Sequence, residues 1–321
     1  MVAGDGRSGL GGGQARQSGT AVVEKPAARP RGPRPSRGYK IFQGVNAFIL
    51  TGVVVVTLLP FINIIARSFS GETYIRSGQV SLWPKGFNLT TYRRVMSDPL
   101  FWTNYRNTVV YTVVATLISM VLTTCYAYVL SKKHLKGRSF LVGIAAFTLF
   151  FNGGLIPNYV LVSGIGLRNT IWAIVLPNAI SVFNLLVMKA FFESLPLDLE
   201  EAGAVDGLNT YGILLRIVLP LSKAVIATMV LFYAVSFWNS WFSAFLYMDQ
   251  LDLFPATVFL RNLIAGATAG TDTTTASDTA LQIDANIQAV TIVLTVLPIM
   301  LVYPFIQRYF VTGILLGAVK G

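Results

Sequence analysis

Catalytic and metal-binding side chains are scarce in this sequence of 321 residues. It has one cysteine, Cys125, and one histidine, His134, and neither lies near a second residue of these types. A disulfide needs a pair of cysteines, and a structural zinc site needs several Cys or His ligands. The pattern G-x4-G-K-[ST], whose backbone amides hold nucleotide phosphates, does not occur. The sequence therefore predicts no catalytic residue, no metal site and no cofactor bound by this chain.

One polar segment, residues 194–220, separates two apolar segments and contains the carboxylates Asp198, Glu200, Glu201 and Asp206. Glu201 offers a carboxylate that could form charge-assisted hydrogen bonds with an arginine of another protein. The small residues Ala202, Gly203 and Ala204 beside it would let that protein approach closely. The alternative is an ordinary helical loop that contacts no partner.

The same segment is predicted to form two short helices joined by a bend. Pro196 can open the first helix, because its missing N–H would be unpaired in the first turn in any case. Gly207 permits the positive φ that a tight bend needs. Asn209 or Thr210 can then cap the second helix.

Composition predicts a membrane protein. Hydrophobic residues make up 54% of the chain and charged residues only 12%, about half their usual share in globular proteins. A helix of about 20 apolar residues crosses the hydrocarbon layer of a bilayer. We therefore expect an all-α polytopic fold with six transmembrane helices. The segments of suitable length without Asp, Glu, Lys, Arg or His are 45–66, 107–131, 139–162, 171–188, 224–247 and 287–306.

The basic residues indicate the orientation in the membrane. If the N-terminus is cytoplasmic, 17 of the 25 lysines and arginines fall in cytoplasmic segments. The positive-inside rule then places both termini and the 194–220 segment in the cytoplasm. The net charge of +11 thus reflects topology, and we expect no binding to nucleic acid.

The chain is expected to divide into a tail and a membrane domain. Residues 1–38 are rich in Gly, Pro, Arg and Ser and contain no apolar run, which predicts a disordered cytoplasmic tail. Residues 39–321 then form the six-helix domain in contact with membrane lipids.

The 194–220 segment also carries a recognisable spacing. Glu201-Ala202-Gly203 is followed by Gly207 after three residues, and by the I-x-L-P sequence of 217–220 after nine more. This pattern resembles the EAA loop of bacterial ABC importer permeases, with Gly203 in place of the second Ala. Leu208 replaces another usual Ala. The resemblance implies a type I importer permease fold, whose cytoplasmic coupling helices sit in a cleft of an ATP-binding subunit. The resemblance also implies which residues couple the chain to the ATPase: Glu200, Glu201, Ala202, Gly203, Asp206, Gly207 and Leu208.

The resemblance covers residues 40 to 321 and points to the carbohydrate-uptake class. Supporting segments are 153–159, 169–173, 238–241 and 309–321. Members of this class import oligosaccharides, including acidic ones such as alginate fragments, across the bacterial inner membrane. The resemblance implies a second permease subunit in a heterodimer, a pair of ATP-binding subunits that hold ATP-Mg, and an extracytoplasmic solute-binding protein.

Uncharged polar and aromatic side chains in the predicted spans are candidates for a solute pathway. Amide groups can hydrogen-bond sugar hydroxyl groups, and an indole face packs against a pyranose ring. The same residue types also bridge packed membrane helices or mark the membrane interface. The candidates are Asn152, Asn158, Asn184, Trp238, Asn239, Trp241 and Tyr247.

The third predicted span contains Gly153, Gly154 and Pro157, which allow two interpretations. They can unwind the helix around a pathway, as in the broken helices of transporters. They can instead end the helix at the outer surface, before the short loop at 163–170.

Other classes of function fit the sequence less well. A stand-alone secondary transporter or channel usually has intramembrane carboxylates or a comparable ion site, and the predicted spans have no Asp, Glu, Lys, Arg or His. An intramembrane enzyme, such as a lipid-modifying transferase, would need such residues in a cluster. The sequence therefore favours import powered by a separate ATPase.

Overall fold

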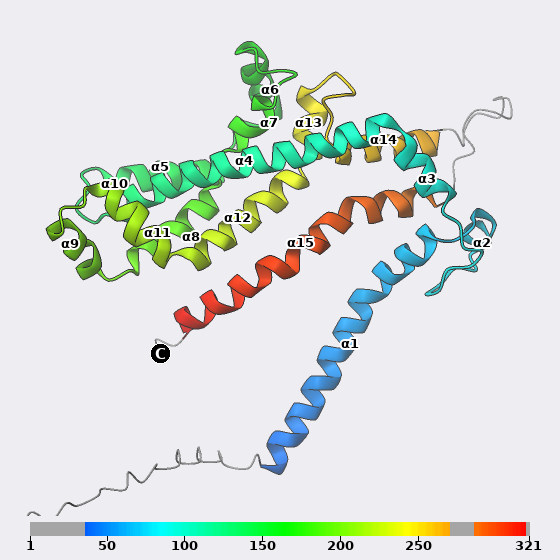
Figure 1. Cartoon of the computed structure of the whole chain (residues 1–321), viewed down its shortest axis with the longest axis horizontal. Coiled ribbons are helices and arrows are strands. Elements are labelled where there is room, and N and C mark those ends of the chain that lie inside the picture. The colour runs from blue at the N-terminus through cyan, green and yellow to red at the C-terminus, as the bar shows by residue number, and fades with distance from the viewer. Residues whose placement is uncertain (1–35, 270–285, 319–321) are drawn as a thin grey trace, which may run out of the picture. The chain divides into compact units, whose positions relative to one another are not determined.

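The computed structural model describes residues 36–269 and 286–318, and every regular element in these two ranges is a helix. The predicted all-α class is therefore confirmed for the described part of the chain (Figure 1). The predicted tail, residues 1–38, lies almost entirely outside the described residues. The chain divides into two units, Met1–Val54 and Val55–Gly321.

In the first unit, the described residues form the first part of α1 (Arg37–Ser68). Its large apolar side chains are exposed, among them Phe42 and Phe48. A long helix that is apolar on all sides and exposed suits a lipid environment.

The second unit is built around α4 (Pro99–Ser131). Ala115, Ser119, Thr123 and Ala127 recur every fourth residue along this helix and are completely buried. Small side chains at this spacing allow neighbouring helices to approach closely in a membrane. The helices that pack in this core are α8 (Val182–Glu193) and α12 (Lys223–Trp238) against α4, and α15 (Ile287–Ala318) against α12.

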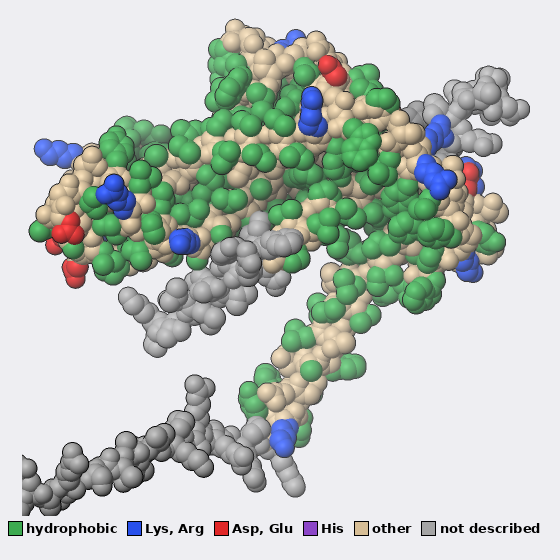
Figure 2. Space-filling model, viewed as in Figure 1, with side chains coloured by type: hydrophobic (Ala, Val, Ile, Leu, Met, Phe, Trp, Pro, Cys, Tyr) green, Lys and Arg blue, Asp and Glu red, His purple; other side chains and the backbone are tan. Residues whose placement is uncertain are grey.

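Shorter helices surround this core. In Figure 1, α9 and α10 lie near one end of α4, and α3 and α14 lie near the other. Figure 2 shows acidic side chains gathered at the α9 end and a mainly hydrophobic flank between the two ends. The shorter elements are α2 (Glu72–Arg76), α3 (Thr90–Ser97), α5 (Arg138–Phe150), α6 (Leu155–Gly164), α7 (Trp172–Val175), the 3-10 turn η1 (Leu176–Asn178), α9 (Leu197–Val205), α10 (Thr210–Ile213), the π-helical turn η2 (Leu214–Val218), α11 (Leu219–Leu221), α13 (Trp241–Tyr247) and α14 (Ala256–Ala269).

Apolar helices long enough to cross a membrane are present, which confirms the predicted membrane character. Among the described residues, Gly38–Ser68 and Pro99–Ser131 are each long enough alone. Up to five spans result if each of three bent helix pairs counts as one. The bends measure 113° between α5 and α6, 53° between the α7–η1 segment and α8, and 85° between the α10–α11 segment and α12. The number of six spans stays a prediction.

The third predicted span is broken at Gly153 and Gly154, and both interpretations of this break stay predictions. α5 ends at Phe150 and α6 begins at Leu155, well before the loop at 163–170. Gly154 has a φ of +87°, a backbone conformation that residues with a Cβ rarely adopt. The amide oxygen of Asn152 accepts a hydrogen bond from the Gly154 N–H at 2.9 Å, so the break keeps this backbone group paired.

The fifth predicted span, 224–247, was expected to be one helix, and this expectation is wrong. α12 ends at Trp238, and α13 begins at Trp241. The side-chain amide of Asn239 donates to the Val235 carbonyl at 2.8 Å, and the backbone carbonyl of Asn239 accepts from the N–H of Trp241 at 2.8 Å. An Asn side chain that bonds nearby backbone in this way competes with continuation of the helix.

Pro298 lies inside α15 and leaves a carbonyl without its usual partner. A proline has no N–H, so the carbonyl of Leu294, four residues earlier, receives no helical hydrogen bond. The hydroxyl of Tyr105 on α4 donates to this carbonyl instead. The indole N–H of Trp238 on α12 donates to the adjacent Thr295 carbonyl at 3.1 Å. Side chains of two neighbouring helices thus satisfy the backbone around the proline.

We predict that Tyr105→Phe destabilises the protein, because it leaves the Leu294 carbonyl unpaired in an apolar setting. The expected loss is about 1–3 kcal/mol, measured as a lower melting temperature of the detergent-purified chain. Adding Pro298→Ala supplies a backbone N–H to the same carbonyl and should reduce the effect of Tyr105→Phe. Tyr74→Phe, at an exposed residue, is the control. Equal melting temperatures for Tyr105→Phe and the unchanged chain would contradict the prediction.

Candidate coupling hairpin and solute cavities

Residues 194–220 fold into the predicted pair of helices with a bend. Pro196 is the N-cap of α9, and Gly207 follows this helix with φ of +82°. Asn209 caps α10, because its side-chain oxygen accepts the N–H of Gly212 at 2.8 Å. Of the two predicted caps, the structure selects Asn209 over Thr210. We call α9, α10 and η2 together the hairpin.

Gly203 faces the interior of the hairpin, so the expectation that it leaves room for a partner is wrong. It is buried, and a Cβ added to it would lie 2.5 Å from Cδ1 of Ile217. Packed atoms do not come this close, so a side chain at this position would require the end of the Ile217 side chain or η2 to shift. Ala202 and Ala204 are exposed, and for them the close approach of a partner stays a prediction.

The outer face of α9 carries a stripe of three exposed residues, Leu197, Glu201 and Val205. They are spaced four apart and so lie on one face of the helix. Val205 is 87% exposed and Leu197 is 62% exposed. Tyr211, at the start of α10, is 77% exposed. Glu201 was predicted from the sequence, whereas these apolar neighbours were not. Large apolar side chains in a charged segment could have indicated an interaction surface.

The other residues assigned to coupling lie in different surroundings. Asp206 and Gly207 are exposed at the bend. Leu208 is half-buried and packs against the hydrophobic core. Glu200 does not face a partner, because its carboxylate pairs with the ammonium group of Lys132 at the end of α4. The structure therefore separates Glu200 from Glu201, its neighbour in sequence.

An amide-lined cavity of about 540 Å³ lies among α6, η1 and α13. Asn152, Asn158, Asn178, Ser243 and Tyr247 supply its polar groups. The remaining lining is mostly aliphatic. We call this the amide cavity, and it brings together three of the predicted pathway residues.

A second cavity, of about 730 Å³, shares Pro177 and Asn178 with the amide cavity. Asn184, Tyr233 and Ser236 contribute polar groups, and phenylalanine rings make up much of the apolar wall. We call it the aromatic cavity. Neither Tyr233 nor Ser236 was selected from the sequence, because their approach to α8 depends on helix packing.

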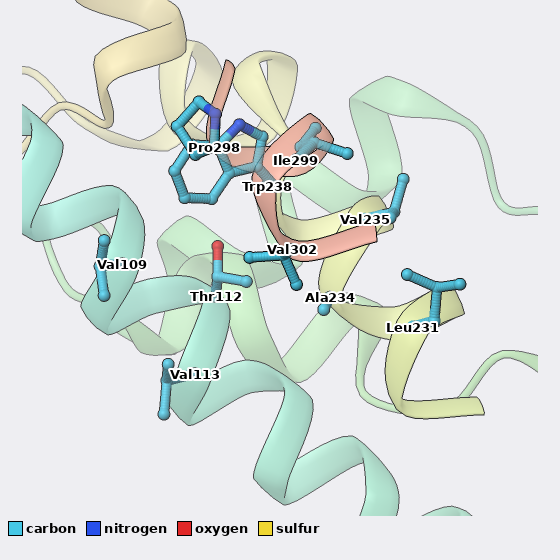
Figure 3. A pocket seen from close by; sticks show the side chains of 10 residues that line it. All are labelled: Val109, Thr112, Val113, Leu231, Ala234, Val235, Trp238, Pro298, Ile299 and Val302. Carbon is cyan, nitrogen blue, oxygen red and sulfur yellow. The ribbon is translucent and has the colours of Figure 1, made fainter. Parts of the chain in front are cut away.

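Three predicted pathway residues lie outside both cavities. Trp238 lines a separate apolar cavity of about 240 Å³ between α4, α12 and α15 (Figure 3). Asn239 uses its amide to end α12. Trp241 lies under the guanidinium group of Arg261, whose carbon is 4.4 Å from the ring centroid. A sugar-binding role for these three residues has no support from their positions.

Known proteins resemble this chain over most of its length. The family model described as binding-protein-dependent transport system inner membrane component matches residues 139–315. Protein LplC of Bacillus subtilis (strain 168) is 41% identical over 284 residues, which cover 88% of this chain and 96% of that protein. The polygalacturonan/rhamnogalacturonan transport system permease protein YtcP of the same organism is 40% identical over 267 residues, with coverage of 83% and 93%.

A solved structure also resembles this chain. It is described as a crystal structure of a bacterial ABC transporter involved in the import of the acidic polysaccharide alginate. One of its chains is 34% identical, superposes with a TM-score of 0.76, and matches 87% of this chain and 99% of its own length. The family match includes the hairpin and both cavities. The chain therefore belongs to the binding-protein-dependent transport system inner membrane components, the membrane-embedded permeases of ABC transporters.

Proposed function

We propose that this chain is the permease subunit of an ATP-driven importer of oligosaccharides in the bacterial inner membrane. The observation that carries the proposal is the hairpin at one end of α4, with Leu197, Glu201 and Val205 exposed along α9. It offers a partner both apolar surface and a carboxylate. Exposed apolar side chains beside charge are typical of interaction sites.

The partner of the hairpin is an ATP-binding subunit. ATP-Mg binds to that subunit and this chain has no catalytic step of its own. Closure of a pair of such subunits around ATP moves the α9 stripe, and the attached helices change the side on which the pathway opens. Glu201 contributes a carboxylate for an arginine of the ATP-binding subunit. The basic residues support a cytoplasmic hairpin and cytoplasmic termini.

The amide and aromatic cavities form this chain's part of the solute pathway. Asn178 lines both, so a chain of sugar units could pass from one to the other. Amide and hydroxyl groups match the donors and acceptors of a sugar, and phenylalanine rings match its apolar face. A second, similar permease closes the other side of the pathway, and an extracytoplasmic binding protein delivers the sugar.

The substrate class we favour is an oligosaccharide that contains uronic acid. YtcP is named for polygalacturonan and rhamnogalacturonan, and the similar solved transporter for alginate. No residue that lines either cavity carries a formal charge. Recognition of the carboxylate by this chain would therefore rest on amide N–H and hydroxyl groups. A stand-alone secondary transporter, the alternative, is favoured by no contact in the described part of the chain.

The substrate proposal predicts selective, ATP-dependent uptake. We expect proteoliposomes with the complete transporter and its binding protein to accumulate radiolabelled trigalacturonate when ATP is present on the side of the membrane that the ATP-binding subunits face. The neutral galactose trimer should enter far more slowly. Uptake at the same rate without ATP, or by this chain without ATP-binding subunits, would contradict the proposal.

The pathway assignment predicts that Asn178→Leu lowers trigalacturonate uptake about tenfold, which corresponds to about 1.4 kcal/mol of lost hydrogen bonding. Val113→Leu, in the apolar cavity, is the matched control and should keep normal uptake. Initial rates in the same proteoliposomes measure both. Normal uptake by Asn178→Leu would remove this residue from the pathway.

The docking assignment predicts that Val205→Asp weakens binding of the ATP-binding subunit about 30-fold, as expected for loss of an apolar anchor worth about 2 kcal/mol. Co-purification and titration of the ATP-binding subunit measure the effect. His134→Asp adds the same charge at an exposed residue outside the stripe and should bind normally. Equal affinity of both variants would exclude the stripe as the docking surface.

The packing of Gly203 predicts that Gly203→Val distorts the hairpin, because its side chain meets Ile217. We expect faster proteolysis of the 194–220 segment and weaker binding of the ATP-binding subunit. Adding Ile217→Ala makes space and should restore part of both properties. Ala202→Val, at the exposed neighbouring residue, should leave the proteolysis rate unchanged. Rapid proteolysis of Ala202→Val as well would argue against a specific contact.

A further inference from the structure

Glu200 and Lys132 form a link between the hairpin and the helical core. The Lys132 ammonium group pairs with the Glu200 carboxylate, and both side chains are only about one-fifth exposed, at 21% and 20%. A partly buried pair is screened less by salt than a surface pair. The pair joins the middle of α9 to the first residue after α4.

Within the described residues, this pair is the one side-chain hydrogen bond or ion pair that connects α9 to a helix outside the hairpin. The helices that α9 packs against most extensively are α10 and η2, which belong to the hairpin itself. A displacement of α9 therefore reaches α4 through Lys132 as well as through the packing of η2 in the hydrophobic core.

Lys132 is also held in place by a residue of the helical core. Its ammonium group lies 4.0 Å from the ring centroid of Tyr128, one turn earlier in α4. Tyr128 is buried and meets Phe192 of α8 edge to face, with 6.4 Å between the ring centroids. A lysine held by a ring and a carboxylate has little freedom to absorb a movement of α9.

α4 in turn contacts the wall of the aromatic cavity. Thr123 is one of the small residues that recur every fourth position along α4. It shares a 2.6 Å hydrogen bond with the hydroxyl of Tyr233 on α12. The same hydroxyl accepts the N–H of Ser181 at 2.9 Å. Ser181 is the N-cap of α8 at the 53° bend, and both it and Tyr233 line the aromatic cavity.

We propose that Lys132 and Glu200 are positioning residues that transmit movement of the docked α9 to α4 and so to the aromatic cavity. The inference rests on the proposed function and adds the contacts through which movement of α9 reaches the aromatic cavity. Glu201 contacts the ATP-binding subunit, whereas Glu200 ties the same helix to the core. Neighbouring carboxylates thus have separate roles.

The test uses the complete transporter in proteoliposomes and a single reporter cysteine. Cys125→Ser removes the native thiol, and Ile180→Cys places a thiol in the exposed wall of the aromatic cavity, at a residue to which no solute contact is assigned. The rate of labelling by a membrane-impermeant maleimide is measured without nucleotide and after trapping with ATP and vanadate. In the reference transporter this rate changes on trapping.

Lys132→Glu and Glu200→Lys should each shrink this trapping-dependent change at least about fivefold, the lower end of ordinary coupling between sites. The double variant Lys132→Glu/Glu200→Lys restores opposite charges and should recover most of the change. The matched control is Lys189→Gln, which breaks an ion pair with Glu193 within α8 and does not touch α9. It should keep the full change.

Other outcomes overturn the inference. A full labelling change in either single variant shows that the pair transmits nothing. A double variant as defective as the single variants shows that charge pairing is not what matters. Loss of the ATP-binding subunit from the single variants, measured by co-purification, assigns the pair to docking instead. If the reference transporter itself binds no ATP-binding subunit or shows no labelling change, the proposed function has failed.

Discussion

Pairing of backbone groups in an apolar environment is the constraint on which this arrangement of helices depends. A free carbonyl or N–H in hydrocarbon costs several kcal/mol, by order of magnitude. Two irregular sites supply such groups with a partner: Asn152 bonds the N–H of Gly154, and Tyr105 bonds the carbonyl of Leu294. A polar side chain thus reaches the backbone at both sites, and one of the two, Asn152, also lines the amide cavity.

Close packing on α4 brings these polar groups together. Its small residues let α8 and α12 approach, and the hydroxyl of Tyr233 then reaches both Thr123 and the backbone of Ser181. A larger side chain at position 123 would separate the helices and leave the N–H of Ser181 without this acceptor. The cavity wall is thus a consequence of helix packing, and it cannot move independently of α4.

The sequence predicted what depends on local chemistry. The hairpin follows from Pro196, Gly207 and Asn209, each of which acts on backbone within a few residues. The inward position of Gly203 was not predictable in this way, because it depends on contact with Ile217 across the bend. Trp238 was assigned to the pathway for its residue type, yet the carbonyl it serves is 57 residues later in the chain. Such long-range pairings are invisible to spacing and composition.

The departure from the EAA pattern at Gly203 has a structural explanation in the same hairpin. An alanine there would bring its Cβ to 2.5 Å from Cδ1 of Ile217, so either the end of the Ile217 side chain or η2 as a whole would have to shift. Moving η2 would also change the angle of α9, since the two pack directly against each other. A shift of η2 would therefore also change the orientation of the Leu197–Glu201–Val205 stripe and the distance from Glu200 to Lys132. Glycine at 203 and isoleucine at 217 act as a matched pair that sets how the hairpin presents itself to a partner.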